Sequence, residues 1–103
     1  MARNVNKAIA DICDGAYDVI DTEGWWDGRG ADGFCYGRGA DGFCIVTAVR
    51  KACAERKLYW AMTAALDAIR AATGDWSIPH WQDRQTEYTV LRKLEEVADA
   101  HRF

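Results

Sequence analysis

The sequence has one proline, Pro79, and no stretch in which apolar and polar residues alternate over the length of a strand. The scarcity of proline leaves long stretches free for helices, and the missing alternation argues against a sheet. The apolar runs are far too short to cross a bilayer, and residues 1–7 lack the apolar run of a signal peptide. We therefore expect a single, cytoplasmic domain that does not enter the membrane.

The sequence also lacks an excess of basic residues. The chain contains thirteen lysines and arginines and sixteen aspartates and glutamates, which gives a net charge of −3. Binding to DNA or RNA without sequence preference needs a basic face that displaces counterions, so nucleic acid is not an expected partner. The chain has five tryptophans among 103 residues, and this favours a protein as the binding partner. That partner could also be a second copy of the chain, which would give a homodimer.

No close cysteine pair such as Cys-x-x-Cys is present, so no zinc site is predicted, and nothing in the sequence calls for a cofactor. Without a secretion signal we expect reduced and mostly buried cysteines. The four cysteines are Cys13, Cys35, Cys44 and Cys53.

Helical periodicity of apolar residues predicts an all-α fold, a small bundle of three to four helices. We expect helices over residues 2–21, 42–55 and 58–73, and a last one from Thr86, a good N-cap. The second and third could also form one continuous helix, because neither glycine nor proline lies between them. Residues 75–83 are expected to be a connector, and Gly15 could permit a close contact between helices.

A tandem duplication occupies the predicted glycine-rich loop over residues 24–42. Residues 28–36 and 37–45 share their first eight residues, Gly-Arg-Gly-Ala-Asp-Gly-Phe-Cys, and differ only at the ninth, which is Tyr36 in the first copy and Ile45 in the second. Extra chain costs little in a surface loop. We expect the second copy to be structural, because it leads into the second helix, and the first to be spare loop.

Three hypotheses for function follow from these segments. The second copy ends at a helix N-terminus that could bind an anion or nucleotide through Arg38, Gly39, Gly42 and Phe43. Alternatively, Cys44 could act as a catalytic thiol with His80 as its base and Asp83 orienting the histidine. In the third hypothesis, Trp26, Tyr36 and Trp76 form an exposed surface that binds a protein partner.

The order of several short motifs resembles a small, uncharacterised helical domain family of actinobacteria and their phages. The motifs are Gly24-Trp25, then Gly42-Phe43-Cys44-Ile45-x-Thr47-Ala48, then Trp81-Gln82-Asp83 before Thr86. The sequence departs from the family pattern at Thr47, where the family has glycine, and at Gln82, where it has asparagine. The family has no established activity, so the resemblance implies a class and an origin but no reaction.

The leading hypothesis is therefore a small non-enzymatic binding or regulatory protein. It rests on the absence of a convincing catalytic set, the acidic composition and the many aromatic residues. The resemblance to a phage-associated family further implies a partner in the host cytoplasm.

Overall fold

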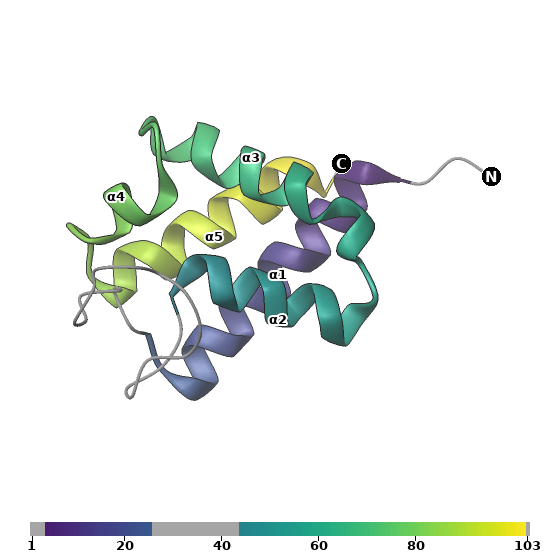
Figure 1. Cartoon of the computed structure of the whole chain (residues 1–103), viewed down its shortest axis with the longest axis horizontal. Helices are drawn as coiled ribbons and strands as arrows, with labels where there is room; N and C mark the ends of the chain where they lie inside the picture. The colour runs from purple at the N-terminus through teal and green to yellow at the C-terminus, as the bar shows by residue number, and fades with distance from the viewer. Residues whose placement is uncertain (1–3, 26–43, 103) are drawn as a thin grey trace.

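The computed structural model describes residues 4–25 and 44–102, and this part of the chain is all helical, as the sequence predicts (Figure 1). It contains five α-helices and one short 3₁₀ segment instead of the expected three to four helices. They are α1 (Val5–Glu23), α2 (Ile45–Arg56), η1 (Tyr59–Ala61), α3 (Met62–Thr73), α4 (Ile78–Gln82) and α5 (Glu87–His101).

Helix α1 is the centre of the fold and packs against α2, α3 and α5. It begins after Asn4, whose side chain accepts a hydrogen bond from the Lys7 amide at 2.9 Å. It ends at Gly24, whose φ of 95° is a conformation that glycine tolerates best. The buried face of α1 matches the predicted stripe, except that Val5 is exposed at the first turn.

Gly15 lets α2 approach α1 closely, as the sequence suggested. A Cβ at this position would lie 2.8 Å from the Ala52 Cβ and 2.6 Å from an Arg56 guanidinium nitrogen. The absence of a side chain therefore sets the distance between the two helices. The Arg56 guanidinium then lies across α1 at this point.

Helices α2 and α3 are separate, so the alternative of one continuous helix is wrong. Lys57 takes the left-handed conformation at φ 57° and ends α2, with its amide bonded to the Cys53 carbonyl. Leu58 and η1 then turn the chain into α3. In the sequence, the helical phase of the apolar residues also changes near Arg56, where this bend lies.

The expected connector over residues 75–83 contains the short helix α4. Ser77 caps it by accepting a hydrogen bond from the His80 amide at 3.4 Å, and Pro79 lies in its first turn. Helix α5 begins after Thr86, whose hydroxyl accepts from the Thr89 amide at 3.3 Å, so that predicted cap is confirmed.

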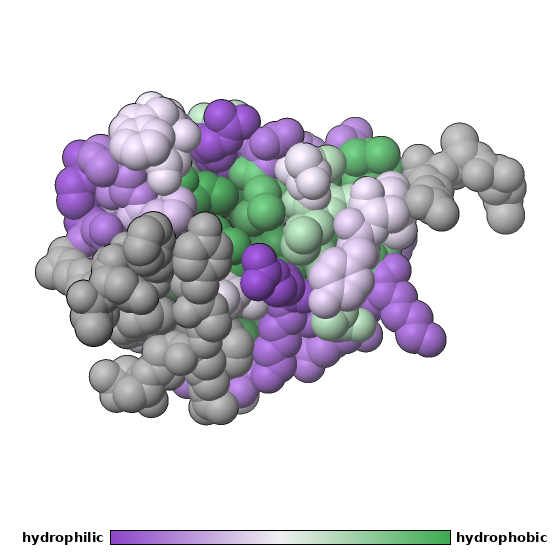
Figure 2. Space-filling model, in the orientation of Figure 1, coloured by the Kyte–Doolittle hydropathy of each residue, from purple (hydrophilic) through white to green (hydrophobic). Residues whose placement is uncertain are grey.

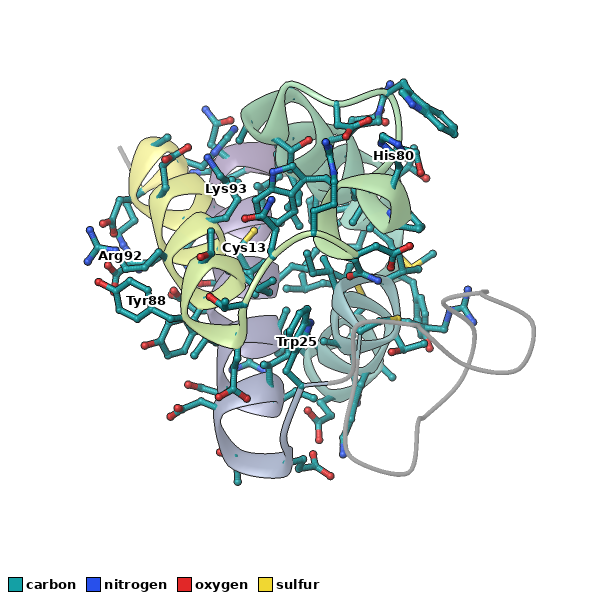
Figure 3. The ribbon with its side chains drawn as sticks, turned by 90° about the vertical axis from the view of Figure 1, so that its left-hand side faces the viewer. Cys13, Trp25, His80, Tyr88, Arg92 and Lys93 are labelled. Carbon is teal, nitrogen blue, oxygen red and sulfur yellow. The ribbon has the colours of Figure 1, made fainter. Side chains whose placement is uncertain are left out.

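The glycine-rich loop lies outside the described residues except for its first two, Gly24 and Trp25. Trp25 packs against the core between the helices (Figure 3). Its indole nitrogen is buried and has no hydrogen-bond partner among the residues that the structure describes. Within residues 4–25 and 44–102, no helix combines the length and apolar character that crossing a bilayer requires.

Candidate functional site

An exposed aromatic and charged cluster surrounds the start of α4. Its centre is Asp75, whose carboxylate is almost buried. The carboxylate lies 2.8 Å from the His80 Nδ1 and accepts a hydrogen bond from Arg84 at 2.7 Å. It also accepts from the Ser77 amide at 3.4 Å, which closes a turn typical of aspartate. The three side chains thus hold one another in place around the short, capped helix α4, to which His80 belongs.

Trp76 lies beside this cluster and is 76% exposed, the largest exposure among the large hydrophobic residues that the structure describes. Its ring centroid is 5.2 Å from that of His80, with the ring planes inclined at 33°. His80 itself is at the surface of the molecule (Figure 3). We call Trp76, His80 and Arg84, anchored by Asp75, the Trp76 cluster.

Hydrogen bonds determine the charge of the anchor. The hydrogen bond from His80 lowers the pKa of the Asp75 carboxyl below its ordinary value, and the amides of Ser77 and Trp76 act in the same direction. Asp75 is therefore anionic at neutral pH, which matches the cationic guanidinium of Arg84. Such a network fixes side chains that would otherwise rotate freely.

The sequence indicated Trp76 and His80 but missed Asp75 and Arg84. A signal for Asp75 was present, because an aspartate after Gly74 and two residues before a helix cap is typical of a turn. Arg84 is nine residues away from Asp75, and its contact depends on the path of α4. Sequence spacing alone does not give that path.

The predicted thiol site is arranged differently from the hypothesis. The carboxylate that orients His80 is Asp75, not Asp83. Cys44 is fully buried and disulfide-bonded, so the expectation of reduced cysteines is wrong for this residue. A sulfur held in a disulfide is not a nucleophilic thiolate.

Cys13 and Cys53 are free and buried, as expected. Burial raises the pKa of Cys13 to about 12 and raises that of Cys53 as well. Because the thiolate is the reactive form, these two thiols are inert at neutral pH.

An anion was expected at the N-terminus of α2. A side chain of the protein itself accepts a hydrogen bond there instead. The Ile45 amide donates a hydrogen bond to the Gln82 side-chain oxygen at 3.0 Å, and Gln82 is fully buried. Cys44 is the N-cap residue, and the Thr47 hydroxyl donates to its carbonyl at 3.1 Å. Part of the hydrogen-bonding capacity that would attract an anion is therefore used internally. The predicted ligand-binding residues Arg38, Gly39, Gly42 and Phe43 lie outside the described residues.

The Gln82 contact gives the Trp81-Gln82-Asp83 motif a structural meaning. Trp81 and Gln82 are buried, and Gln82 joins α4 to the beginning of α2 across 37 positions of sequence. Two of the three motifs that carry the family resemblance therefore meet in space. Of the predicted partner-binding residues, Trp26 and Tyr36 lie outside the described part, and Trp76 is exposed as a contact residue must be.

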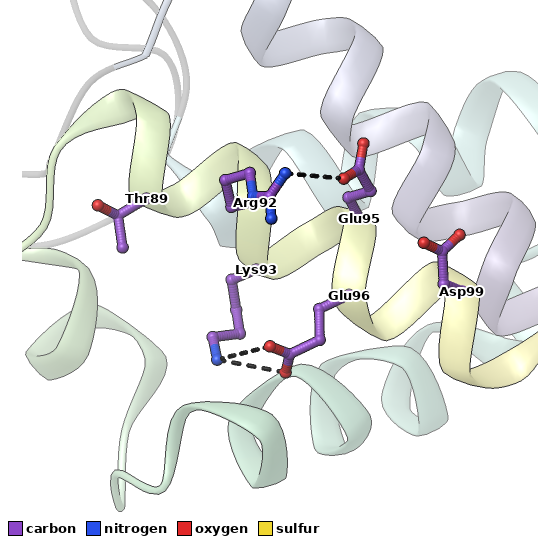
Figure 4. Close-up of a pocket in the computed structure, with 6 residues that line it drawn as sticks. All are labelled: Thr89, Arg92, Lys93, Glu95, Glu96 and Asp99. Carbon is purple, nitrogen blue, oxygen red and sulfur yellow. Dashed lines mark hydrogen bonds and ion pairs between the residues drawn. The ribbon is translucent and has the colours of Figure 1, made fainter.

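Two surface hollows are lined by charged residues. A hollow of about 310 Å³ follows the outer face of α5, and a second, of about 480 Å³, lies where α1, α2 and α5 meet. In the first, Lys93 pairs with Glu96 at 3.3 Å and Arg92 with Glu95 at 3.6 Å (Figure 4). In the second, Arg102 binds Asp14 through two hydrogen bonds of 2.8 Å. These charges already have partners within the protein.

No group of three potential metal ligands occurs in the described ranges.

The family model for a "Family of unknown function (DUF6197)" matches residues 5–100, which is nearly the whole chain. The chain belongs to this family. No curated protein matches it, and no solved structure does. An uncharacterised small domain family was also what the order of motifs indicated. The DUF6197 assignment brings no activity with it, so function has to be argued from the surface of this chain.

Proposed function

We propose that this DUF6197 domain is a non-enzymatic binding protein whose contact surface is centred on Trp76. The observation that carries the proposal is the 76% exposure of a tryptophan held beside a network of hydrogen bonds. Exposing an indole to water is unfavourable, and tryptophan and arginine are the residues most enriched at the energetic centres of protein interfaces.

The way in which the cluster is held also supports binding. Asp75 fixes His80 and Arg84, and the His80 ring supports the Trp76 ring from one side. A contact residue that is already ordered loses less conformational entropy when the partner arrives. The Trp76 cluster therefore combines a large apolar ring, a cation and a titratable donor on a pre-organised element.

The family that the motifs resemble occurs in actinobacteria and their phages. This association suggests where the binding partner comes from. We propose that the partner is a host protein and that the domain modulates it by occupying a surface. This step rests on the resemblance alone.

Affinity capture with matched variants tests the proposed function. Immobilised wild-type protein, Trp76→Ala and Tyr88→Ala are each exposed to an actinobacterial lysate. Tyr88 is 71% exposed on α5 and serves as the control for losing an exposed aromatic ring. We expect one protein that the wild type and Tyr88→Ala retain and Trp76→Ala loses, because truncating a central tryptophan costs about 2 kcal/mol or more of binding free energy. Retention of the same proteins by all three variants would refute the Trp76 surface.

A further inference from the structure

A second surface feature indicates the chemistry of the partner, and its interpretation rests on the proposed function. Half-buried apolar side chains remain on α2 and α3, two helices that contact each other. On α2, Val46 lies four residues before Arg50, and on α3, Met62 lies four residues before Leu66, so each pair shares a helix face. Figure 2 shows hydrophobic atoms gathered over α3 in the middle of this view, bordered by hydrophilic atoms on the side of α2. We call Val46, Met62 and Leu66 the α2–α3 strip.

The charges of the fold are segregated around this strip. Helix α2 contains three basic residues and one acidic residue, whereas α1 contains one basic and five acidic residues. Helix α5 is also acidic, with four acidic and two basic residues. The molecule thus has a net charge of −3 and yet carries a locally basic edge along α2.

Contacts within the protein use some of these basic side chains and leave others exposed. Lys51 binds Glu23 of α1 at 2.6 Å, and the Arg56 guanidinium lies over Gly15. Arg50 and Lys57 are exposed, and neither has an ionic partner among the described residues. Arg50 is on the same face of α2 as Val46, so an unpaired cation borders the apolar strip.

Lys57 has a further property. It takes the left-handed conformation at the end of α2, which costs a non-glycine residue about 1 kcal/mol. A lysine at this position therefore provides a charge at the expense of local stability. The substitution Lys57→Gly would therefore remove the charge and at the same time raise the stability of the fold.

We propose that the α2–α3 strip binds an acidic amphipathic helix of the partner protein. An amphipathic helix presents apolar residues at spacings of three and four, which match the spacing of Met62 and Leu66 on α3. Acidic residues beside that stripe would meet Arg50 and Lys57, and complementary charges of this kind set the register and exclude basic segments. A nucleic acid does not fit, because the centre of the strip is apolar and the neighbouring helix α1 is acidic.

Two synthetic peptides test the proposal by fluorescence anisotropy. Both carry the same leucine stripe at helical spacing, one with glutamate and the other with lysine at the remaining positions. We expect the wild-type protein to bind the glutamate peptide and not the lysine peptide. Arg50→Glu should weaken binding of the glutamate peptide about tenfold or more, because an attraction becomes a repulsion. The control is Arg92→Glu on α5, which changes the net charge equally and should leave the affinity unchanged.

Lys57→Gly separates a binding defect from a folding defect. This variant should bind the glutamate peptide several-fold more weakly while its melting temperature rises, so unfolding cannot account for the loss. Equal binding of both peptides, binding of neither, or equal weakening by Arg50→Glu and Arg92→Glu would each overturn the proposal. Self-association of the wild type that Arg50→Glu abolishes in sedimentation experiments would identify a second copy as the occupant and overturn it too.

The two proposals can fail separately. If the glutamate peptide binds as expected but Trp76→Ala still captures the same proteins, the Trp76 surface is wrong and the strip stands. If Trp76→Ala loses its captured protein and neither peptide binds, the proposed function stands and the acidic helix is wrong.

Discussion

Helices α1 and α3 are both amphipathic, but they bury very different shares of their residues. Nine of the nineteen residues of α1 are buried, whereas only Ala65 and Ile69 are buried among the twelve of α3. Helix α1 packs extensively against α2 and α5, whereas α3 contacts four helices more sparsely and leaves Met62 and Leu66 half-buried. The same kind of apolar pattern thus produces a core element in one place and a half-buried outer face in the other.

We propose that this difference separates stability from function within one small domain. The exposed or half-buried apolar residues from Trp60 to Trp76 belong to η1, α3 and the approach to α4. If α3 and α4 are the binding side, substitutions there should affect partner binding more than folding. Substitutions in α1 should do the opposite.

The comparison between α1 and α3 is tested most directly by truncating one apolar residue in each helix. Ile12 of α1 is fully buried, and Ile12→Ala should lower the free energy of unfolding by about 3 kcal/mol through lost burial and a residual cavity. Leu66→Ala on α3 should cost only about 1 kcal/mol, because its side chain already meets water. Urea unfolding measures both. Equal losses would mean that α3 is as much a part of the core as α1.

The junction between α4 and α2 should be nearly as sensitive. Gln82→Met keeps the size of the buried side chain but leaves the Ile45 amide without its acceptor, which should cost about 2 kcal/mol. Faster hydrogen exchange of the Ile45 amide would report the lost bond directly. Gln85→Met, three residues further on, is the control and should change stability by less than about 0.5 kcal/mol. A stable Gln82→Met protein would show that the motif is not structural.

The sequence predicted the core of this fold better than its surface, for a physical reason. Burial repeats with the helical period, so the stripes on α1 and α5 could be identified from spacing alone, and only Val5 and Leu91 lie outside the buried set. Leu58, Met62 and Leu66 have equally good spacing but are half-buried. Whether a stripe is covered depends on how extensively neighbouring helices pack over it, and the periodicity of one helix does not contain that information.

The candidate site was less predictable because its contacts join residues that local rules do not relate. Trp76 could be selected as an exposed aromatic, whereas the bond between Gln82 and Ile45 spans 37 positions. Helix α4 was missed although Ser77 and Pro79 are a typical helix start, since five residues are too few to show a period. The disulfide of Cys44 could not be inferred from a sequence that lacks a secretion signal.

A smaller effect should come from filling the space between α1 and α2. Gly15→Ala gains helix propensity of about 1 kcal/mol, but its methyl group would lie too close to Ala52, which cannot move aside without its backbone. We expect a net loss of about 1 kcal/mol in urea unfolding. Adding Ala52→Gly should relieve the contact and recover part of the loss relative to Ala52→Gly alone. Full tolerance of Gly15→Ala would mean that α2 can shift along α1, and hence that the core side is more adaptable than the packing implies.

The smallest expected effect concerns the binding side and depends on pH. The carboxyl pKa of Asp75 is lowered in the folded protein, so the folded state favours the ionised form. The resulting stabilisation is present above the ordinary aspartate pKa of 3.8 and is lost as the pH falls through the lower folded value. Asp75→Asn should therefore unfold with less pH dependence than the wild type below about pH 4.

Because the side chains of His80 and Arg84 are half exposed, this change in stability should be small. A clearer signal should be a change in Trp76 fluorescence as the cluster loosens. A Trp76 environment that stays constant through this titration would show that Asp75 does not hold the cluster, and the contrast between a pre-organised binding side and a packed core would lose its main support.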